Sequence, residues 1–168
     1  EHKGLYWSKI KGTEDAKTVE PDEDYIIPLG KGRIVIEALQ TNIEKGKTAL
    51  VITYGMGVYW AQGAANQFDN QIEIMDLRTL FPLDDTLILE RVKVHNKIMI
   101  LTEEPVNNGF AQALAGKIQH LCFNYLDAPI EVVGAENMPA IPLNATLEFT
   151  MLPNADKVKE RLEMLLGY

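Results

Sequence analysis

The chain has 168 residues, of which 46% are hydrophobic, so it is long enough for one globular core of ordinary size. Its 16 basic and 24 acidic residues give a formal net charge of −8, and the basic residues are scattered, which argues against a nucleic-acid partner. No apolar run approaches the roughly 20 residues that a bilayer span requires. We therefore expect one soluble, cytoplasmic domain that binds neither nucleic acid nor a membrane.

The first 33 residues differ in composition from the rest. The sequence begins at Glu1 and enters a basic and aromatic stretch without a capping or turn signal, which favours a piece of a longer chain. Residues 12–24 are polar and rich in turn-forming residues, and short apolar runs emerge only at residues 25–27 and 34–36. We interpret residues 1–33 as a connector that leads into an edge strand.

A regular alternation of strands and helices begins near residue 47. The apolar run at residues 49–54 predicts a strand, and Gly55, Met56 and Gly57 then predict a tight turn. Apolar residues recur at helical spacing from Val58 to Phe68. Residues 72–75 predict a second strand, and the helix that follows can be capped by Asp84 or Asp85.

The alternation continues through the second half of the chain. Residues 97–101 predict a third parallel strand, and residues 110–125 carry one apolar face across about four turns of helix. Pro129 ends that helix, and residues 130–133 predict a fourth parallel strand. An irregular stretch with Pro139, Pro142 and Pro153 follows, and Asn154 is the expected N-cap of a last helix.

These elements predict the fold class. Strands that alternate with helices of ten or more residues require crossover connections, and such connections produce a mostly parallel sheet with helices on both faces. We therefore predict an α/β fold, a three-layer α/β/α sandwich.

Gly55 and Gly57 are the first candidate for a ligand site. They follow a strand and open a helix, where backbone N–H groups and the helix dipole can hold a phosphate. The third glycine of the dinucleotide fingerprint is missing, so a plain tight turn is the favoured interpretation. An independent nucleotide-binding regulatory module remains an alternative function.

The remaining reactive residues predict no active site. Glu103 and Glu104 follow a parallel strand, but neighbours in an extended segment point to opposite sides, which favours a capping or loop-fixing role. The single Cys122 fits a buried hydrophobic position. The three histidines have no metal-site spacing and are expected to be surface or half-buried side chains: His2, His95 and His120.

Eight short strings are distributed over nearly the whole chain: EHKGLY (1–6), YIIPLGK (25–31), VITYG (51–55), DLRTLFPLD (76–84), TEEP (102–105), NGF (108–110), YLDAP (125–129) and LPNA (152–155). In their order and spacing they resemble the beta subunits of thiamine-diphosphate-dependent 2-oxo acid dehydrogenases of the pyruvate and branched-chain type.

The resemblance implies a transketolase C-terminal-type domain at residues 34–168, with a five-stranded, mostly parallel sheet and one antiparallel edge strand. Residues 1–33 would connect it to a preceding pyrimidine-binding domain. In that family, thiamine diphosphate and magnesium are held by other domains, through a Gly-Asp-Gly motif that does not occur here. The resemblance thus implies part of an enzyme that oxidatively decarboxylates pyruvate or 2-oxoisovalerate. It also implies that this piece contains no catalytic, cofactor-binding or metal-binding residue. The piece alone would therefore be inactive.

The resemblance also implies partners. Beta subunits of the family pair with each other through this domain, and the paired surface receives the subunit-binding domain of the dihydrolipoyl acyltransferase. They also assemble with an alpha subunit or a fused alpha half. Asp127 and the terminal carboxylate of Tyr168 occupy the family's docking positions, although a turn or capping role for Asp127 is the alternative.

Two positions depart from the family pattern. Many members carry histidine where Thr102 and Tyr59 stand, so the resemblance does not assign the roles of those histidines to this chain. The matching domain of transketolase or deoxyxylulose-phosphate synthase is a further alternative, which the LDAP and LPNA strings disfavour.

Overall fold

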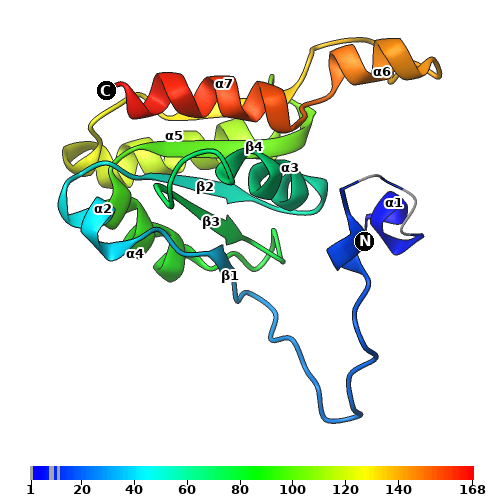
Figure 1. Cartoon of the computed structure of the whole chain (residues 1–168), viewed down its shortest axis with the longest axis horizontal. Coiled ribbons are helices and arrows are strands. Elements are labelled where there is room, and N and C mark those ends of the chain that lie inside the picture. Colours follow the sequence, from blue (N-terminus) through cyan, green and yellow to red (C-terminus); the bar gives the residue numbers. More distant parts are fainter. Residues whose placement is uncertain (1, 8–9, 11) are drawn as a thin grey trace.

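The computed structural model describes residues 2–7, 10 and 12–168, and its centre is a five-stranded sheet in the order β1-β3-β2-β4-β5 (Figure 1). Strand β1 is antiparallel to β3, and the other neighbouring pairs are parallel. The predicted mostly parallel sheet with one antiparallel edge strand is confirmed. The strands are β1 (Arg33–Ile36), β2 (Ala49–Thr53), β3 (Ile72–Asp76), β4 (Ile98–Pro105) and β5 (Glu131–Ala135).

The central strands are apolar on both faces because both faces are covered. Every residue of β2 is buried, and its parallel register with β3 runs from Ala49 opposite Ile72 to Thr53 opposite Asp76. A strand buried on both sides is expected to be a continuous apolar run rather than an alternating pattern. The continuous apolar run is therefore the pattern that predicted a strand at residues 49–54.

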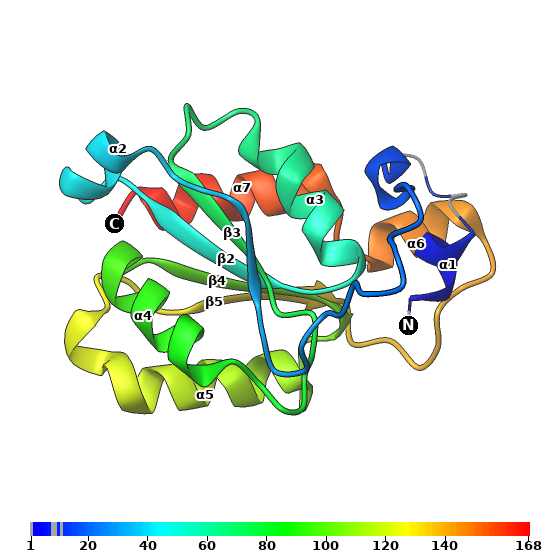
Figure 2. The same ribbon diagram turned by 90° about the horizontal axis from the view of Figure 1, so that it is seen from below.

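Helices cover the sheet in two layers (Figure 2). Helices α3 (Met56–Ala65) and α7 (Ala155–Leu166) lie on one face, and α4 (Asp85–His95) and α5 (Phe110–Cys122) lie on the other. Each face has its own core, in which Leu162 of α7 and Ile88 of α4 are fully buried. The short α2 (Gln40–Glu44) joins β1 to β2, and none of the described helices could cross a membrane.

Side-chain caps begin two of the helices as predicted. The Asp84 carboxylate accepts a hydrogen bond from the backbone N–H of Leu87 at 3.3 Å, and a second from Gly32 at 3.1 Å. The Asn154 amide oxygen accepts one from the N–H of Lys157 at 3.0 Å. Asp84 therefore caps α4 and also fixes the segment before β1.

The stretch with three prolines is less irregular than predicted. It contains α6 (Ala145–Met151), whose cap Asn144 accepts hydrogen bonds from the N–H groups of Thr146 and Leu147. The Lys157 ammonium donates to the carbonyls of Thr150 and Leu152 at the other end. Side chains therefore satisfy both ends of a helix too short to be stable alone.

Two further boundaries differ from the sequence prediction. The helix expected at residues 110–125 ends as an α-helix at Cys122 and continues as one 3-10 turn, η2 (Phe123–Tyr125). The connector also contains local structure, namely α1 (Lys3–Tyr6) and the 3-10 turn η1 (Glu14–Ala16). Figure 1 shows a long loop between this N-terminal part and β1.

Candidate docking and ligand sites at the two edges of the sheet

Asp127 lies in the turn that leads into β5, at the edge where the parallel strands begin, which we call the amino edge. Its backbone N–H donates to the carbonyl of Asn96 at 2.9 Å. The Asn96 side chain in turn donates to the carbonyl of Tyr125 at 2.6 Å. The turn is thus fixed by its backbone, and no described residue forms a hydrogen bond or ion pair with the exposed Asp127 carboxylate.

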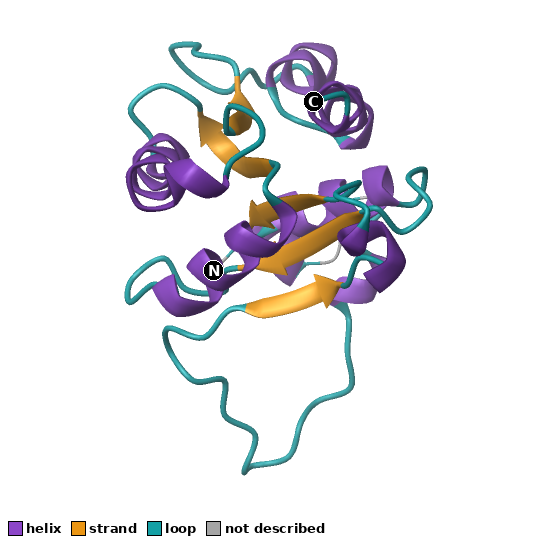
Figure 3. Cartoon of the chain, turned by 90° about the vertical axis from the view of Figure 1, so that its left-hand side faces the viewer, coloured by secondary structure: helices purple, strands orange, loops and turns teal. Residues whose placement is uncertain are grey.

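Tyr168 reaches the same edge from α7. Leu165, three residues earlier, is buried in one core cluster with Ala128, the residue after Asp127. Tyr168 itself is 70% exposed, and its N–H donates to the carbonyl of Leu165. Figure 3 looks onto this edge, where the C-terminus lies. The structure therefore brings the two predicted docking residues to one edge of the domain.

A buried ionic network lies beneath the amino edge and involves His95. The Arg91 guanidinium donates two hydrogen bonds of 2.5 Å to the Glu73 carboxylate. His95 is 1% exposed, with Nε2 3.2 Å from Glu73 Oε1 and Nδ1 2.9 Å from the Thr48 hydroxyl. The prediction that His95 is a surface or half-buried side chain is therefore wrong, because polar partners on β3 and before β2 satisfy both ring nitrogens.

The network changes the acidity of Glu73. Burial alone would raise the pKa of this carboxyl, but hydrogen bonds from His95 and Arg91, together with their charges, outweigh burial and hold the pKa below its usual range. Glu73 is therefore a carboxylate at neutral pH, although its side chain is almost completely buried.

The opposite, carboxyl edge of the sheet carries a second polar group around Tyr54. The Tyr54 hydroxyl lies 2.8 Å from the Thr102 hydroxyl, and its ring packs edge-on against Phe110. Burial raises the pKa of Tyr54 although the bond with Thr102 opposes the shift. Thr102, one of the two positions where the resemblance implies histidine, is thus a buried partner of a protonated phenol.

Glu103 and Glu104 have separate roles at this edge. Glu104 Oε1 accepts from the N–H of Ala111 at 2.9 Å in the first turn of α5, which confirms the predicted capping role. Glu103 instead lies 2.6 Å from Nε2 of His2, whose Nδ1 accepts from the N–H of Leu5. His2 is half-buried, as predicted, and it holds the N-terminal segment against the carboxyl edge.

The other two predicted groups have simple environments. His120 is exposed on α5, and Cys122 is buried in the core, both as expected from the sequence. Burial raises the pKa of the Cys122 thiol, and the Lys93 charge offsets part of this rise.

Gly55 and Gly57 are required by the backbone and by packing. Gly55 has φ of 57°, a left-handed conformation that glycine adopts without strain. A Cβ at position 57 would lie 2.0 Å from the Thr53 hydroxyl oxygen and 3.4 Å from the Leu101 carbonyl. Gly57 thus faces the sheet and allows α3 to approach it, as the favoured turn interpretation requires.

Replacing Gly57 with alanine is expected to lower the free energy of unfolding by about 1 to 3 kcal/mol, because the new methyl group overlaps the end of β2. Gly116→Ala is the matched control, since a Cβ there meets no atom within 4 Å and alanine favours a helix by about 1 kcal/mol. Urea unfolding of both variants checks the prediction, which fails if Gly57→Ala is as stable as wild type.

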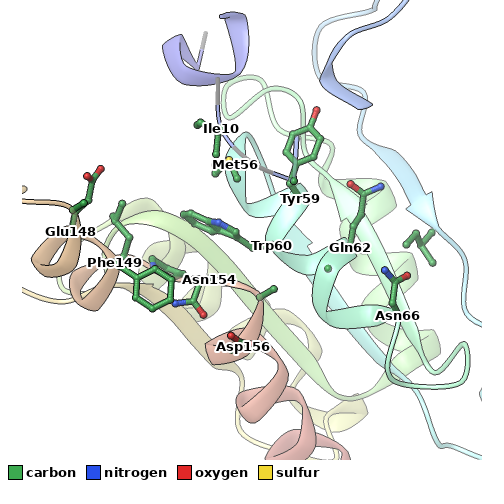
Figure 4. A pocket seen from close by; sticks show the side chains of 17 residues that line it. Ile10, Met56, Tyr59, Trp60, Gln62, Asn66, Glu148, Phe149, Asn154 and Asp156 are labelled. Atoms are coloured by element: carbon green, nitrogen blue, oxygen red, sulfur yellow. The ribbon is translucent and has the colours of Figure 1, made fainter. Parts of the chain in front are cut away.

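A groove of about 940 Å³ was not predicted from the sequence (Figure 4). It runs between α3, α6 and the start of α7, and Trp60 and Phe149 come from its opposite walls. Tyr59, the second position where the resemblance implies histidine, also lines it. The groove could not be inferred without α6, which supplies one wall.

The described side chains do not fit a diphosphate-bound magnesium ion. Among them, no three His, Cys, Asp or Glu residues are close enough together to hold a metal. Magnesium requires hard oxygen ligands in near-octahedral geometry, and the two adjacent carboxylates of β4 are directed to different partners.

Comparison with known proteins decides the family. A family model described as the C-terminal domain of transketolase matches residues 38–158. The chain belongs to the transketolase C-terminal domain family. Among solved structures, this transketolase C-terminal domain is similar to a split-gene transketolase, described as an inactive beta4 tetramer, with a TM-score of 0.69 and 18% identity over 87% of this chain and 45% of that one. That likeness confirms the fold.

Several curated relatives with higher identity are dehydrogenase beta subunits. The domain is 32% identical to the 2-oxoisovalerate dehydrogenase subunit beta of Bacillus subtilis, over 100% of this chain and 48% of the relative. It is 34% identical to the pyruvate dehydrogenase E1 component subunit beta of Rickettsia conorii, over 90% and 43%. The chain thus spans about half the length of these relatives, and the predicted resemblance is confirmed.

Proposed function

We propose that this transketolase C-terminal domain is the assembly and docking part of a thiamine-diphosphate-dependent 2-oxo acid dehydrogenase, in a beta subunit or a fused beta half. Similarity to beta subunits extends over the whole chain. The structural observation that carries the proposal is the Asp127 carboxylate, which is exposed on a turn fixed by backbone hydrogen bonds. Thiamine diphosphate and magnesium are then bound by other domains, and the substrate is pyruvate or a branched-chain 2-oxo acid.

The N-terminal segment has a place in this proposal. Residues 1–33 connect the domain to a preceding pyrimidine-binding domain, and the pair of His2 with Glu103 holds the start of the connector at the carboxyl edge. Docking uses the opposite, amino edge, so one edge meets the rest of the dehydrogenase and the other is open to a partner. The assembly contains a second beta chain and an alpha subunit or alpha half.

The proposed docking partner is the subunit-binding domain of the dihydrolipoyl acyltransferase. Asp127 and the Tyr168 carboxylate face arginine or lysine side chains of that domain. Charge-assisted hydrogen bonds of this kind are short and strong, and complementary charges also steer the encounter. The net charge of −8 supports a basic partner.

Asp127→Ala in the complete subunit is expected to weaken binding of the cognate subunit-binding domain about tenfold or more, because the partner's cation is left unpaired. Calorimetric titration at low ionic strength measures the change, and added salt is expected to weaken the wild type. Glu148→Ala removes an equal charge from exposed α6 and serves as the control. Equal affinities of Asp127→Ala and wild type would contradict the role of Asp127.

The Tyr168 carboxylate is tested by ligating a C-terminal peptide that ends in an amide. Deleting Tyr168 only moves the carboxylate to Gly167, so amidation is the cleaner change. A protein ligated in the same way with a free carboxylate is the control. Weaker binding of the amide supports the anchor, and unchanged binding removes Tyr168 from the proposed site.

A further inference from the structure

The carboxyl ends of β2 and β4 form the topological switch point of the sheet. The two strands are parallel neighbours, but α3 follows β2 on one face of the sheet and α5 follows β4 on the other. In open α/β sheets, ligands bind outside the carboxyl ends of the strands at such a point. A ligand of this domain is therefore expected beside the residues that follow β2 and those near the end of β4.

A side chain of the chain itself lies at the switch point. His2 belongs to the N-terminal segment, which lies outside the carboxyl ends of the strands (Figure 2). Its Nε2 is 2.6 Å from Glu103 Oε2 on β4, and its Cδ2 is 3.6 Å from the position that a Cβ on Gly55 would take. Only 24% of the His2 side chain is exposed. The imidazole thus lies between the turn after β2 and a carboxylate of β4.

The hydrogen bonds of His2 define the state of its ring. Nδ1 accepts from the N–H of Leu5 at 3.2 Å, so Nδ1 carries no proton. Nε2 then carries the ring's single N–H proton and donates it to the Glu103 carboxylate. We call these partners the His2 site: the Glu103 carboxylate, Gly55 and the N–H of Leu5. The site fits a neutral imidazole, because it offers one acceptor and one donor to the two ring nitrogens.

The same site is unfavourable for a phosphate. The glycine turn and the first turn of α3 resemble the positions at which helix N-termini hold anions, but here the Glu103 carboxylate lies beside them. Burial raises the pKa of Tyr54, and the charges of Glu104 and Glu103 raise it further, so negative charge acts on this edge. A phosphate would face that charge, and like charges placed together are unfavourable.

We propose that the switch point of this domain is an imidazole site and that His2 is its occupant, so the connector is latched where this fold class takes a ligand. The proposal does not depend on docking at the amino edge. Free imidazole and His2 then compete for the same partners. The site accepts a small ligand only when the connector is released.

The latch is tested by hydrogen exchange in the full-length protein. Glu103→Ala is expected to raise the exchange rate of the Leu5 and Tyr6 amides about tenfold, because α1 loses the contact that holds His2 in place. Glu104→Ala is the matched control, since that carboxylate caps α5 through Ala111 and does not contact His2. Equal exchange of Leu5 and Tyr6 in Glu103→Ala and wild type would overturn the latch.

The imidazole site is tested with free imidazole at about pH 8, where the ring is mostly neutral. NMR of the imidazole ring protons is expected to show saturable binding to His2→Ala, about tenfold or more tighter than to wild type. The double variant His2→Ala with Glu103→Ala is expected to lose this binding, and 1-methylimidazole, which has no N–H donor, is expected to bind about tenfold more weakly. Equal binding of imidazole to wild type and His2→Ala would overturn the site. Binding of inorganic phosphate to His2→Ala in place of imidazole would make it an anion site and overturn the inference as well.

Discussion

Replacing Glu73 with alanine is expected to lower the free energy of unfolding by about 3 to 5 kcal/mol. The Glu73 side chain is 1% exposed and is the shared partner of Arg91 and His95. Its removal leaves a guanidinium and an imidazole edge without the carboxylate that compensates their desolvation. Urea unfolding with an unchanged m-value measures the loss. A loss below about 1 kcal/mol, the usual range of an exposed pair, would contradict a structural role for the network.

The pH dependence of the same network has a defined sign. The pKa of Glu73 is lower in the folded chain than its ordinary value of 4.5, so the folded state favours the carboxylate. Its stabilising contribution is therefore fully present above that value and is lost as the pH falls through the folded pKa. The stability difference between wild type and Glu73→Gln is expected to shrink below about pH 4.5. A difference that stays constant down to pH 3 would assign the effect to packing.

Leu162→Ala is expected to lower the free energy of unfolding by about 2 to 5 kcal/mol. Leu162 is fully buried between α7 and the sheet, so the truncation removes apolar contacts and leaves a cavity. Met164→Ala is the matched control, since Met164 is 63% exposed on the same helix and its change should be within about 0.5 kcal/mol. Equal effects of the two variants would mean that α7 does not pack as the structure describes.

The fold was predictable wherever one physical pattern dominated a segment. Strands β2 and β4 are buried on both faces and begin as short apolar runs, and α7 has a single apolar stripe that follows its cap, Asn154. Helix α6 has no such signal, because only Met151 of its seven residues is buried. Its stability depends on Lys157, which belongs to the next helix, so no local pattern could indicate it.

The candidate sites were predictable only in part. Resemblance indicated Asp127 and Tyr168, and the structure places both at the amino edge. The burial of His95 depends on contacts with Glu73 and Thr48, which are distant in sequence. Its place at a helix end therefore predicted a more exposed side chain than the structure shows. Leu121 and Tyr125 were predicted in one apolar stripe, but Leu121 is 49% exposed within α5, and Tyr125 is 45% exposed on η2, after the α-helix ends at Cys122.

The most direct test of a docking rather than a catalytic role compares two activities of the intact dehydrogenase with Asp127→Ala. Decarboxylation of the 2-oxo acid is measured with an artificial electron acceptor, and the overall reaction is measured with limiting acyltransferase. The proposed role predicts that the first activity stays within about twofold of wild type and that the second falls about tenfold or more. An equal fall in both activities would place Asp127 in the catalytic machinery, and an unchanged overall reaction would show that docking uses another surface.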